Sequence, residues 1–113
     1  MIEDYRFGNI RIDGKNYTSD VKIINEEVKP NWWRKEGHNL FPEDIKDILE
    51  AKPEILVVGT GAYGVMKISS QVRKLLEQEK IELIEAKTEK AAQIYNELLQ
   101  SGKKVAFAAH LTC

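Results

Sequence analysis

Residues 55–64 read ILVVGTGAYG, an apolar run that leads directly into three glycines. A short apolar run bounded by glycine predicts a buried β-strand that ends in a turn. Gly59, Gly61 and Gly64 also have the G-x-G-x-x-G spacing of dinucleotide-binding proteins, and Glu85 follows where a ribose-binding acid is expected. The stretch therefore raises two questions: which fold it belongs to, and whether it binds a nucleotide.

Two helices and two further strands follow this first strand along the chain. The sequence pattern predicts a helix over 69–79, a strand over 81–86, a helix over 89–101 and a strand over 104–109. Thr88 has the position of a helix N-cap, and Gly102 that of a helix-ending glycine. Because the connections are short, the three strands are expected to be parallel, with right-handed crossovers. Residues 53–113 are therefore interpreted as a β-α-β-α-β unit.

The first part of the chain, residues 1–52, has a different pattern. Residues 9–24 alternate apolar and polar positions around Asp13-Gly14, which predicts an antiparallel β ribbon. Residues 25–41 have neither helical nor strand periodicity and form a predicted long loop, after which Pro42 opens a predicted helix over 42–51. We therefore predict a single α/β domain over residues 1–113, with an antiparallel ribbon, a long loop and one helix before the parallel unit.

Three observations argue against a dinucleotide site. The β-α-β-α-β unit has only half of the strands of a six-stranded dinucleotide-binding fold, and the first part of the chain is not β-α-β. Ser69 and Ser70 have the position of the helix start, which leaves a connecting loop too long for a phosphate-binding turn. We therefore expect a structural glycine turn and no cofactor, with anion binding by the backbone N–H groups of Gly59–Gly61 as the alternative.

Composition limits the classes of partner. Seventeen basic and eighteen acidic residues give a formal charge of -1, which disfavours nucleic-acid binding through a broad basic face. The sequence has no signal-peptide pattern and no apolar run of about 20 residues, so we expect no membrane association. The single cysteine, Cys113, excludes an internal disulfide, which fits a cytoplasmic protein.

The ends of the three predicted parallel strands carry chemically useful residues. Gly59, Thr60 and Gly61 follow the first strand, Thr88 follows the second, and His110, Thr112 and Cys113 follow the third. Parallel strands would bring these residues to the edge where open α/β sheets bind ligands. Each also has a simpler interpretation. Thr88 can serve only as a helix cap, and His110 with Cys113 supplies two ligands where a closed zinc site needs four, so no metal is expected.

The long loop contains the sequence Trp32-Trp33-Arg34. A tryptophan there can fold back and cover the core, or it can lie at a protein interface, where Trp and Arg are enriched. Arg34 can hold an anionic group while Trp33 closes over it. Lys67, beyond the glycine turn, faces either an anion or solvent.

The C-terminal stretch resembles a known family whose pattern is T-x-x-A-x-x-x-Y-N-x-L, then a glycine, a valine-containing strand and H-x-T-C. The matching positions are Thr88, Ala91, Tyr95, Asn96, Leu98, Gly102, Val105, His110, Thr112 and Cys113. Further matches are Gly59-Thr60-Gly61, the MKIS segment with Lys67, Trp33-Arg34 and Phe7-Gly8. Gly64 lies outside this pattern. The family is the archaeal MTH-nine-three-eight-like domain of unknown function, related to the adipogenesis-associated cytoplasmic protein and, distantly, to mitochondrial complex I assembly factor three.

The resemblance implies a three-layer α/β domain with a mixed central sheet and an extra β layer. An antiparallel last strand in such a sheet would remove His110 and Cys113 from the glycine edge. The resemblance implies no reaction, cofactor or catalytic residue, and the assembly-factor relatives indicate protein partners.

Two functions follow from the sequence as hypotheses. The first is a non-catalytic binding or protein-interaction module, with a homodimer as one form of interaction. The second is an anionic small-ligand site or an enzyme site at the strand-end edge, built from Gly59, Thr60, Gly61, Lys67, Thr88, Trp33, Arg34 and His110. Interaction requires exposed apolar surface near the tryptophans, whereas ligand binding requires a pocket that Arg34 lines.

Overall fold

The computed structural model describes residues 1–113 and contains ten strands, one 3₁₀ turn and three α-helices. The strands are β1 (Ile2–Arg6), β2 (Asn9–Ile12), β3 (Lys15–Tyr17), β4 (Val21–Ile24), β5 (Glu27–Lys29), β6 (Asn39–Leu40), β7 (Ile55–Thr60), β8 (Lys67–Ile68), β9 (Glu82–Ala86) and β10 (Val105–His110). The 3₁₀ turn is η1 (Pro42–Ile45), and the helices are α1 (Lys46–Ala51), α2 (Ser70–Gln78) and α3 (Thr88–Gln100).

The central sheet is mixed and has the strand order β5-β4-β10-β7-β9. Strands β7, β9 and β10 run parallel, as their short helical connections predict, whereas β4 and β5 are antiparallel to their neighbours. The predicted mixed sheet with a parallel β-α-β-α-β second half is therefore confirmed. Because β10 is parallel to β7, His110 ends beside Thr60, at the glycine edge.

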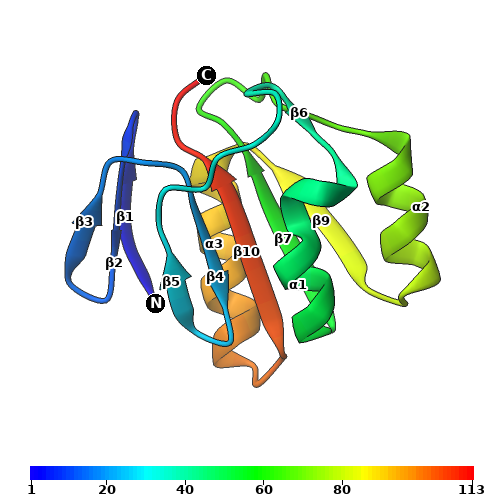
Figure 1. Ribbon diagram of the computed structural model, residues 1–113. Helices are drawn as coiled ribbons and strands as arrows, with labels where there is room; N and C mark the ends of the chain where they lie inside the picture. The colour runs from blue at the N-terminus through cyan, green and yellow to red at the C-terminus, as the bar shows by residue number, and fades with distance from the viewer.

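The domain has layers on both faces of the central sheet (Figure 1). Alternate residues of β7 and β10 point to opposite faces, so each strand contributes to two separate apolar clusters. One cluster joins the sheet to α3 and the β1-β2-β3 sheet, and the other joins it to α1 and α2. The antiparallel three-stranded sheet is the extra β layer that the resemblance implies.

Local sequence signals account for the helix boundaries. The Ser69 hydroxyl accepts a hydrogen bond from the Val72 N–H at 3.2 Å and caps α2, as predicted for this serine pair. Helix α3 turns Ala91 and Tyr95 into the core, and Gly102 follows its end with a φ of 84°. Helix α1 ends at Ala51, and its C-cap residue, Lys52, has a left-handed backbone directly before Pro53.

The first part of the chain differs from the prediction in several details. The hairpin at Asp13-Gly14 joins only β2 and β3, since β4 leaves the ribbon and pairs with β10. Residues 25–41, predicted as a loop, contain β5 and the short β6, and the helix predicted from Pro42 begins as the 3₁₀ turn η1. The prediction missed β1, which has only one buried residue, Ile2, and so lacks an apolar alternation.

Candidate functional site: a polar cluster at the carboxyl edge of the central sheet

An aspartate, an arginine and a histidine meet at one edge of the central sheet. Asp20 immediately precedes β4, and His110 is the last residue of β10. Because β4 runs antiparallel to β10, with Val21 opposite Ala109, the start of β4 lies next to the end of β10. Asp20 and His110, 90 residues apart in the sequence, are therefore neighbours in the fold.

Arg34 reaches this pair from the loop between β5 and β6. This loop crosses the sheet edge (Figure 1). Backbone contacts to the start of β4 hold the loop: the Trp32 N–H donates to the Asp20 carbonyl at 2.9 Å, and the Asn31 N–H donates to Ser19 Oγ at 2.8 Å. The buried Trp32 indole donates to the Asp44 carbonyl at 3.0 Å, and its ring lies 4.6 Å from the Arg34 guanidinium carbon. The loop therefore places Arg34 in a cation–π contact below the surface.

The three side chains form a tight hydrogen-bonded cluster. The Arg34 Nη2 donates to Asp20 Oδ2 and to the Gly37 carbonyl, both at 2.8 Å, and His110 Nδ1 lies 2.8 Å from the same Asp20 oxygen. Nη2 also lies 3.1 Å from His110 Nδ1, but it has only two hydrogens, which Asp20 and Gly37 accept. His110 Nδ1 therefore carries a hydrogen and donates it to Asp20, which leaves Nε2 facing the Thr112 hydroxyl at 3.4 Å.

Asp20 is an anion in this cluster. Burial by itself raises the pKa of its carboxyl, but hydrogen bonds from His110, from the Leu111 N–H and from Arg34 outweigh the burial, and the positive charge of Arg34 adds to them. The resulting pKa is below the ordinary value of 3.8. The Asp20 carboxylate therefore compensates the charge of Arg34, whose side chain is only 3% exposed.

A pocket of about 400 Å³ opens beside the cluster. Only two of its nine lining residues are hydrophobic, and the nine come from three separate parts of the chain. The lining residues are Ser19, Asp20, Asn31, Trp32, Trp33, Arg34, Gly37, His110 and Thr112. Arg34 is one of these lining residues, but its Nε and Nη1 are closed to solvent and have no hydrogen-bond acceptor in the protein. They are the only buried side-chain polar atoms of the chain without a partner.

The glycine turn lies at the same edge but has no free donors in its loop. The N–H of Gly61 donates to Thr88 Oγ1, that of Ala62 to the Thr112 carbonyl, and those of Tyr63 and Val65 to the Cys113 carbonyl oxygen. A Cβ on Gly61 would lie 2.6 Å from that Cys113 oxygen. The chain segment that follows β10 thus occupies the concave side of the turn.

Thr88 does not cap α3 with its side chain, contrary to the sequence interpretation. Lys87 is the N-cap, and Thr88 Oγ1 donates to the His110 carbonyl at 2.6 Å while it accepts from the Gly61 N–H at 2.9 Å. The hydroxyl therefore ties the ends of β7, α3 and β10 together. Gly59 makes this approach possible, because a Cβ there would lie 2.8 Å from Thr88 Oγ1.

The predicted site residues therefore separate into two groups. Trp33, Arg34 and His110 line the pocket, whereas Gly59, Gly61 and Thr88 form the packed turn. Thr60 Oγ1 donates to the Ala86 carbonyl at 3.1 Å, and Lys67, in β8, is exposed and outside the pocket lining. No group of three or more His, Cys, Asp or Glu side chains is arranged to hold a metal ion.

The sequence interpretation missed Asp20. Its neighbours Arg34 and His110 are 14 and 90 residues away, so no local spacing marks it. The only local signal is a charged residue directly before the apolar strand Val21–Ile24, which is equally typical of a solvated strand end.

A mixed central sheet with helices on both faces and a separate antiparallel sheet defines the class: this is a layered α/β domain. Residues 2–110 match the family described as a protein of unknown function (DUF498/DUF598), and the chain belongs to this family. The family predicted from the sequence resemblance is thereby confirmed.

Solved structures of relatives extend this result. The conserved hypothetical protein PH1505 from Pyrococcus horikoshii OT3 is 31% identical, with a TM-score of 0.84 over 100% of this chain and 99% of that chain. The protein MT938 is 29% identical, with a TM-score of 0.84 over 100% and 98% of the two chains. A protein from Bartonella henselae described as an outer membrane protein shares the fold at 23% identity, with a TM-score of 0.84 over 99% and 94%. The relatives thus include bacterial proteins, and the family does not assign this chain to archaea. None of the helices is both long enough and apolar enough to span a membrane.

Proposed function

We propose that this protein is a non-catalytic interaction module of the cytosol that binds a protein partner at the carboxyl edge of its central sheet. The observation that supports the proposal is the exposure of three large aromatic side chains at this edge. Phe7 is 57% exposed, Trp33 85% and Tyr63 70%. Aromatic side chains at such exposure are characteristic of residues that become buried when a partner binds.

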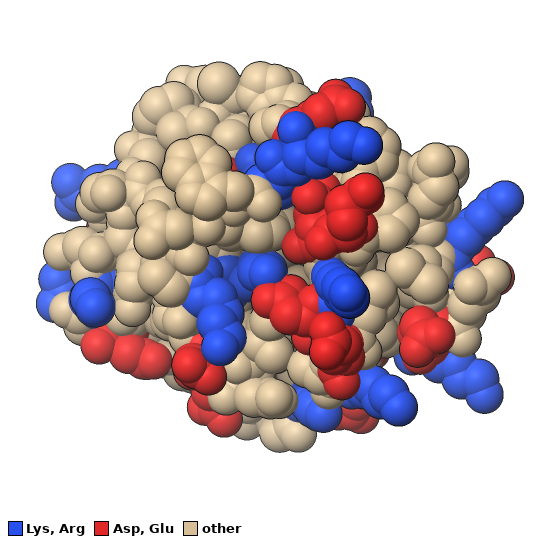
Figure 2. All heavy atoms as spheres, in the orientation of Figure 1, with Lys and Arg blue, Asp and Glu red and all other residues tan.

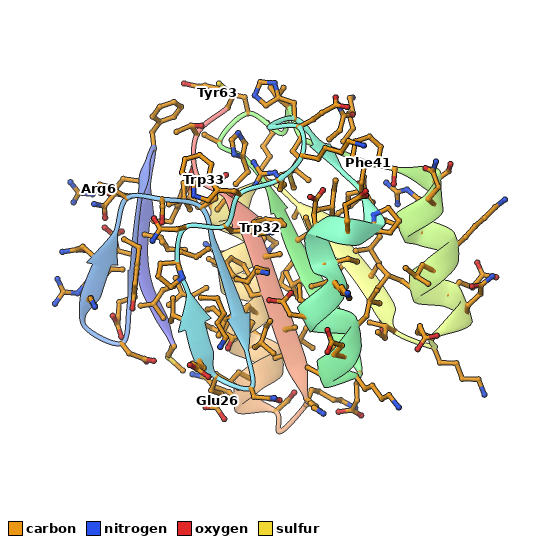
Figure 3. All side chains as sticks on the ribbon, viewed as in Figure 1. Arg6, Glu26, Trp32, Trp33, Phe41 and Tyr63 are labelled. Carbon is orange, nitrogen blue, oxygen red and sulfur yellow. The ribbon has the colours of Figure 1, made fainter.

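The three aromatic residues surround one short segment, residues 110–112. The rings of Phe7 and Tyr63 lie 6.0 Å apart, and the neighbouring Gly8 N–H donates to the Leu111 carbonyl at 2.9 Å. Trp33 lines the pocket together with His110 and Thr112. We call Phe7, Trp33 and Tyr63 the aromatic edge. Figure 3 labels two of its members, Trp33 and Tyr63, at the same end of the molecule.

The distribution of charged side chains also supports this edge as the protein-binding surface. Figure 2 shows an extended area without charged side chains over the upper left of this view, where Figure 3 labels Trp33 and Tyr63, whereas Lys, Arg, Asp and Glu side chains gather in the centre, on the right and along the lower edge. A surface with aromatic residues and few charges resembles the centre of a protein interface. The assembly-factor relatives implied by the sequence resemblance also suggest protein partners.

Site-specific photo-crosslinking in cells tests the proposal. A crosslinking amino acid at position 33 should capture one discrete partner, and the same amino acid at Glu77 on α2 should not. The purified partner should then bind the wild-type chain, and Trp33→Ala should weaken binding by about 2 kcal/mol or more, whereas Glu77→Ala should leave it unchanged. Capture of a second copy of this chain would show that the interaction forms a homodimer. Equal binding by wild type and Trp33→Ala would contradict the proposal.

A further inference from the structure

Arg34 is a buried cation with unused hydrogen-bond donors. The guanidinium has five N–H bonds, and the two on Nη2 go to Asp20 and to the Gly37 carbonyl. The three on Nε and Nη1 have no acceptor in the protein, although both nitrogens are buried. The Trp32 ring covers a face of the guanidinium, but a stacked ring does not accept the hydrogens, which lie in the guanidinium plane. Buried donors without a partner are rare in folded proteins, and these belong to a residue that lines a pocket, so the pocket is the nearest place from which an acceptor could come.

We propose that the pocket binds a small organic acid whose carboxylate accepts hydrogen bonds from Nε and Nη1 of Arg34. The pocket volume, about 400 Å³, accommodates a small molecule, and Trp33 offers an apolar surface for the remainder of the acid. Ser19, Asn31 and Thr112 provide polar groups around the same space. Trp33 belongs to both this site and the aromatic edge, but acid binding depends on Arg34, so the two proposals are tested by different substitutions.

Because both nitrogens are closed to solvent, binding of the acid requires side chains around Arg34 to rearrange. The β5–β6 loop is held to the start of β4 by hydrogen bonds from the Trp32 N–H to the Asp20 carbonyl and from the Asn31 N–H to the Ser19 hydroxyl. The neighbouring Trp33 side chain is 85% exposed and can move without loss of core contacts. We therefore expect Trp33 to change its environment when the acid binds.

The charges of the cluster favour a monoanion. Asp20 and Arg34 compensate each other, so one carboxylate would add an uncompensated negative charge. Protonation of His110 Nε2 would balance that charge, while Nδ1 keeps its hydrogen bond to Asp20. A phosphate dianion would exceed the available positive charge, and the turn amides that would help to hold it already have acceptors.

Binding should therefore take up a proton at His110. The titratable and charged groups that face its ring are Asp20 before β4, Arg34 in the β5–β6 loop and His38 from the same loop, whose ring centroid is 5.5 Å away. Cys113 follows in the segment after β10. A second imidazolium at His38 would oppose protonation of His110, so His38 has to be tested separately.

Calorimetric titration with benzoate, and with benzamide as the uncharged analogue, tests the site. Benzoate should bind wild type, and benzamide and inorganic phosphate should bind at least about tenfold more weakly. Arg34→Lys should lower the affinity for benzoate by about tenfold or more. The exposed control Arg6→Lys should leave this affinity unchanged. Affinity should rise as the pH falls, because the acid binds together with a proton. His110→Asn keeps a donor toward Asp20 and should remove this pH dependence, whereas His38→Asn should retain it.

An NMR experiment on the wild-type protein avoids the risk that Arg34→Lys does not fold. The Nε–H signal of Arg34 should shift during benzoate titration, whereas that of Arg73, which pairs with Glu85 on the surface, should not. Equal affinity for benzoate and benzamide, or an Arg34 signal that benzoate leaves unchanged, would overturn the proposal. Benzoate binding that is independent of pH would overturn its proton-linked part.

Discussion

The carboxyl edge of the central sheet contains two regions that differ in how they use their hydrogen-bond donors. In the turn after β7, the N–H groups of Gly61, Ala62, Tyr63 and Val65 all donate to acceptors of the same chain. In the adjacent pocket, Arg34 leaves Nε and Nη1 unpaired although they are buried. The turn has the spacing of a known ligand-binding motif, but its N–H groups are all paired within the chain. The pocket has no such ligand-binding motif, but Arg34 beside it has unpaired hydrogen-bond donors. A glycine pattern therefore indicates close packing of backbone here, and does not indicate a ligand.

Removal of the Asp20 carboxylate is the most direct test of the buried ion pair beside the pocket. Asp20→Ala leaves the guanidinium of Arg34 buried without a counter-charge and should lower the free energy of unfolding by about 3–5 kcal/mol. Urea denaturation monitored by tryptophan fluorescence measures this loss of stability. The control is Asp4→Ala, since Asp4 pairs with Arg6 on the surface and should contribute at most about 1 kcal/mol. Equal effects of the two substitutions would mean that Arg34 does not depend on Asp20.

On the side of the turn, Gly61→Ala should destabilise the protein by about 2–4 kcal/mol. Gly61 has a φ of 106°, and the added Cβ would also meet the Cys113 backbone. Gly14→Ala is a matched control, because Gly14 has a φ of 81° and open space around it, so only the backbone conformation is penalised. Thermal denaturation of both variants separates the two contributions. Equal losses would show that the segment after β10 does not fill the turn.

Thr88→Val tests the link between β7, α3 and β10. The substitution preserves shape but leaves the Gly61 N–H and the His110 carbonyl without the hydroxyl they share. We expect a loss of about 1–3 kcal/mol in urea denaturation. Thr18→Val, at an exposed position, should change stability by no more than about 0.5 kcal/mol. A neutral Thr88→Val would contradict the role given to this hydroxyl.

The pH dependence of stability tests the lowered pKa of Asp20 in the pocket. The folded pKa of Asp20 is below 3.8, so the unfolded chain binds a proton at this residue more readily than the folded chain does. The contribution of Asp20 to stability should therefore be complete above the unfolded pKa and lost as the pH falls through the folded pKa. Urea midpoints over this acid range should decline less steeply for Asp20→Asn than for wild type. Parallel declines would show that Asp20 has an ordinary pKa in the folded protein.

The sequence predicted much of the fold because the relevant signals are local. Apolar runs, Ser69 as a cap and Gly102 as a helix end all lie within a few residues of the elements that they define. Short connections then implied parallel strands and a common edge for the ends of β7, β9 and β10. The position of β4 was not accessible in this way, because its alternation continues that of the ribbon although it pairs with β10.

The candidate site was predicted only in part for a similar reason. Trp33, Arg34 and His110 were recognised by residue type, but their connection through Asp20 depends on the antiparallel pairing of β4 with β10. Thr88 shows the opposite error, since its position before a helical pattern indicated a cap while the fold gives its hydroxyl other partners.

By itself, the sequence determined the three main strands and two helices of the second half, though not the short β8, because these depend on periodicity and on residues close together in the chain. The family and its mixed sheet were implied by the resemblance, which rests on a pattern of residue types. Only the tertiary structure decided which strand lies beside β10, which residue compensates Arg34 and whether the glycine turn is open. Each of these depends on contacts between segments many residues apart, whose geometry is set by strand order and packing and not by local spacing.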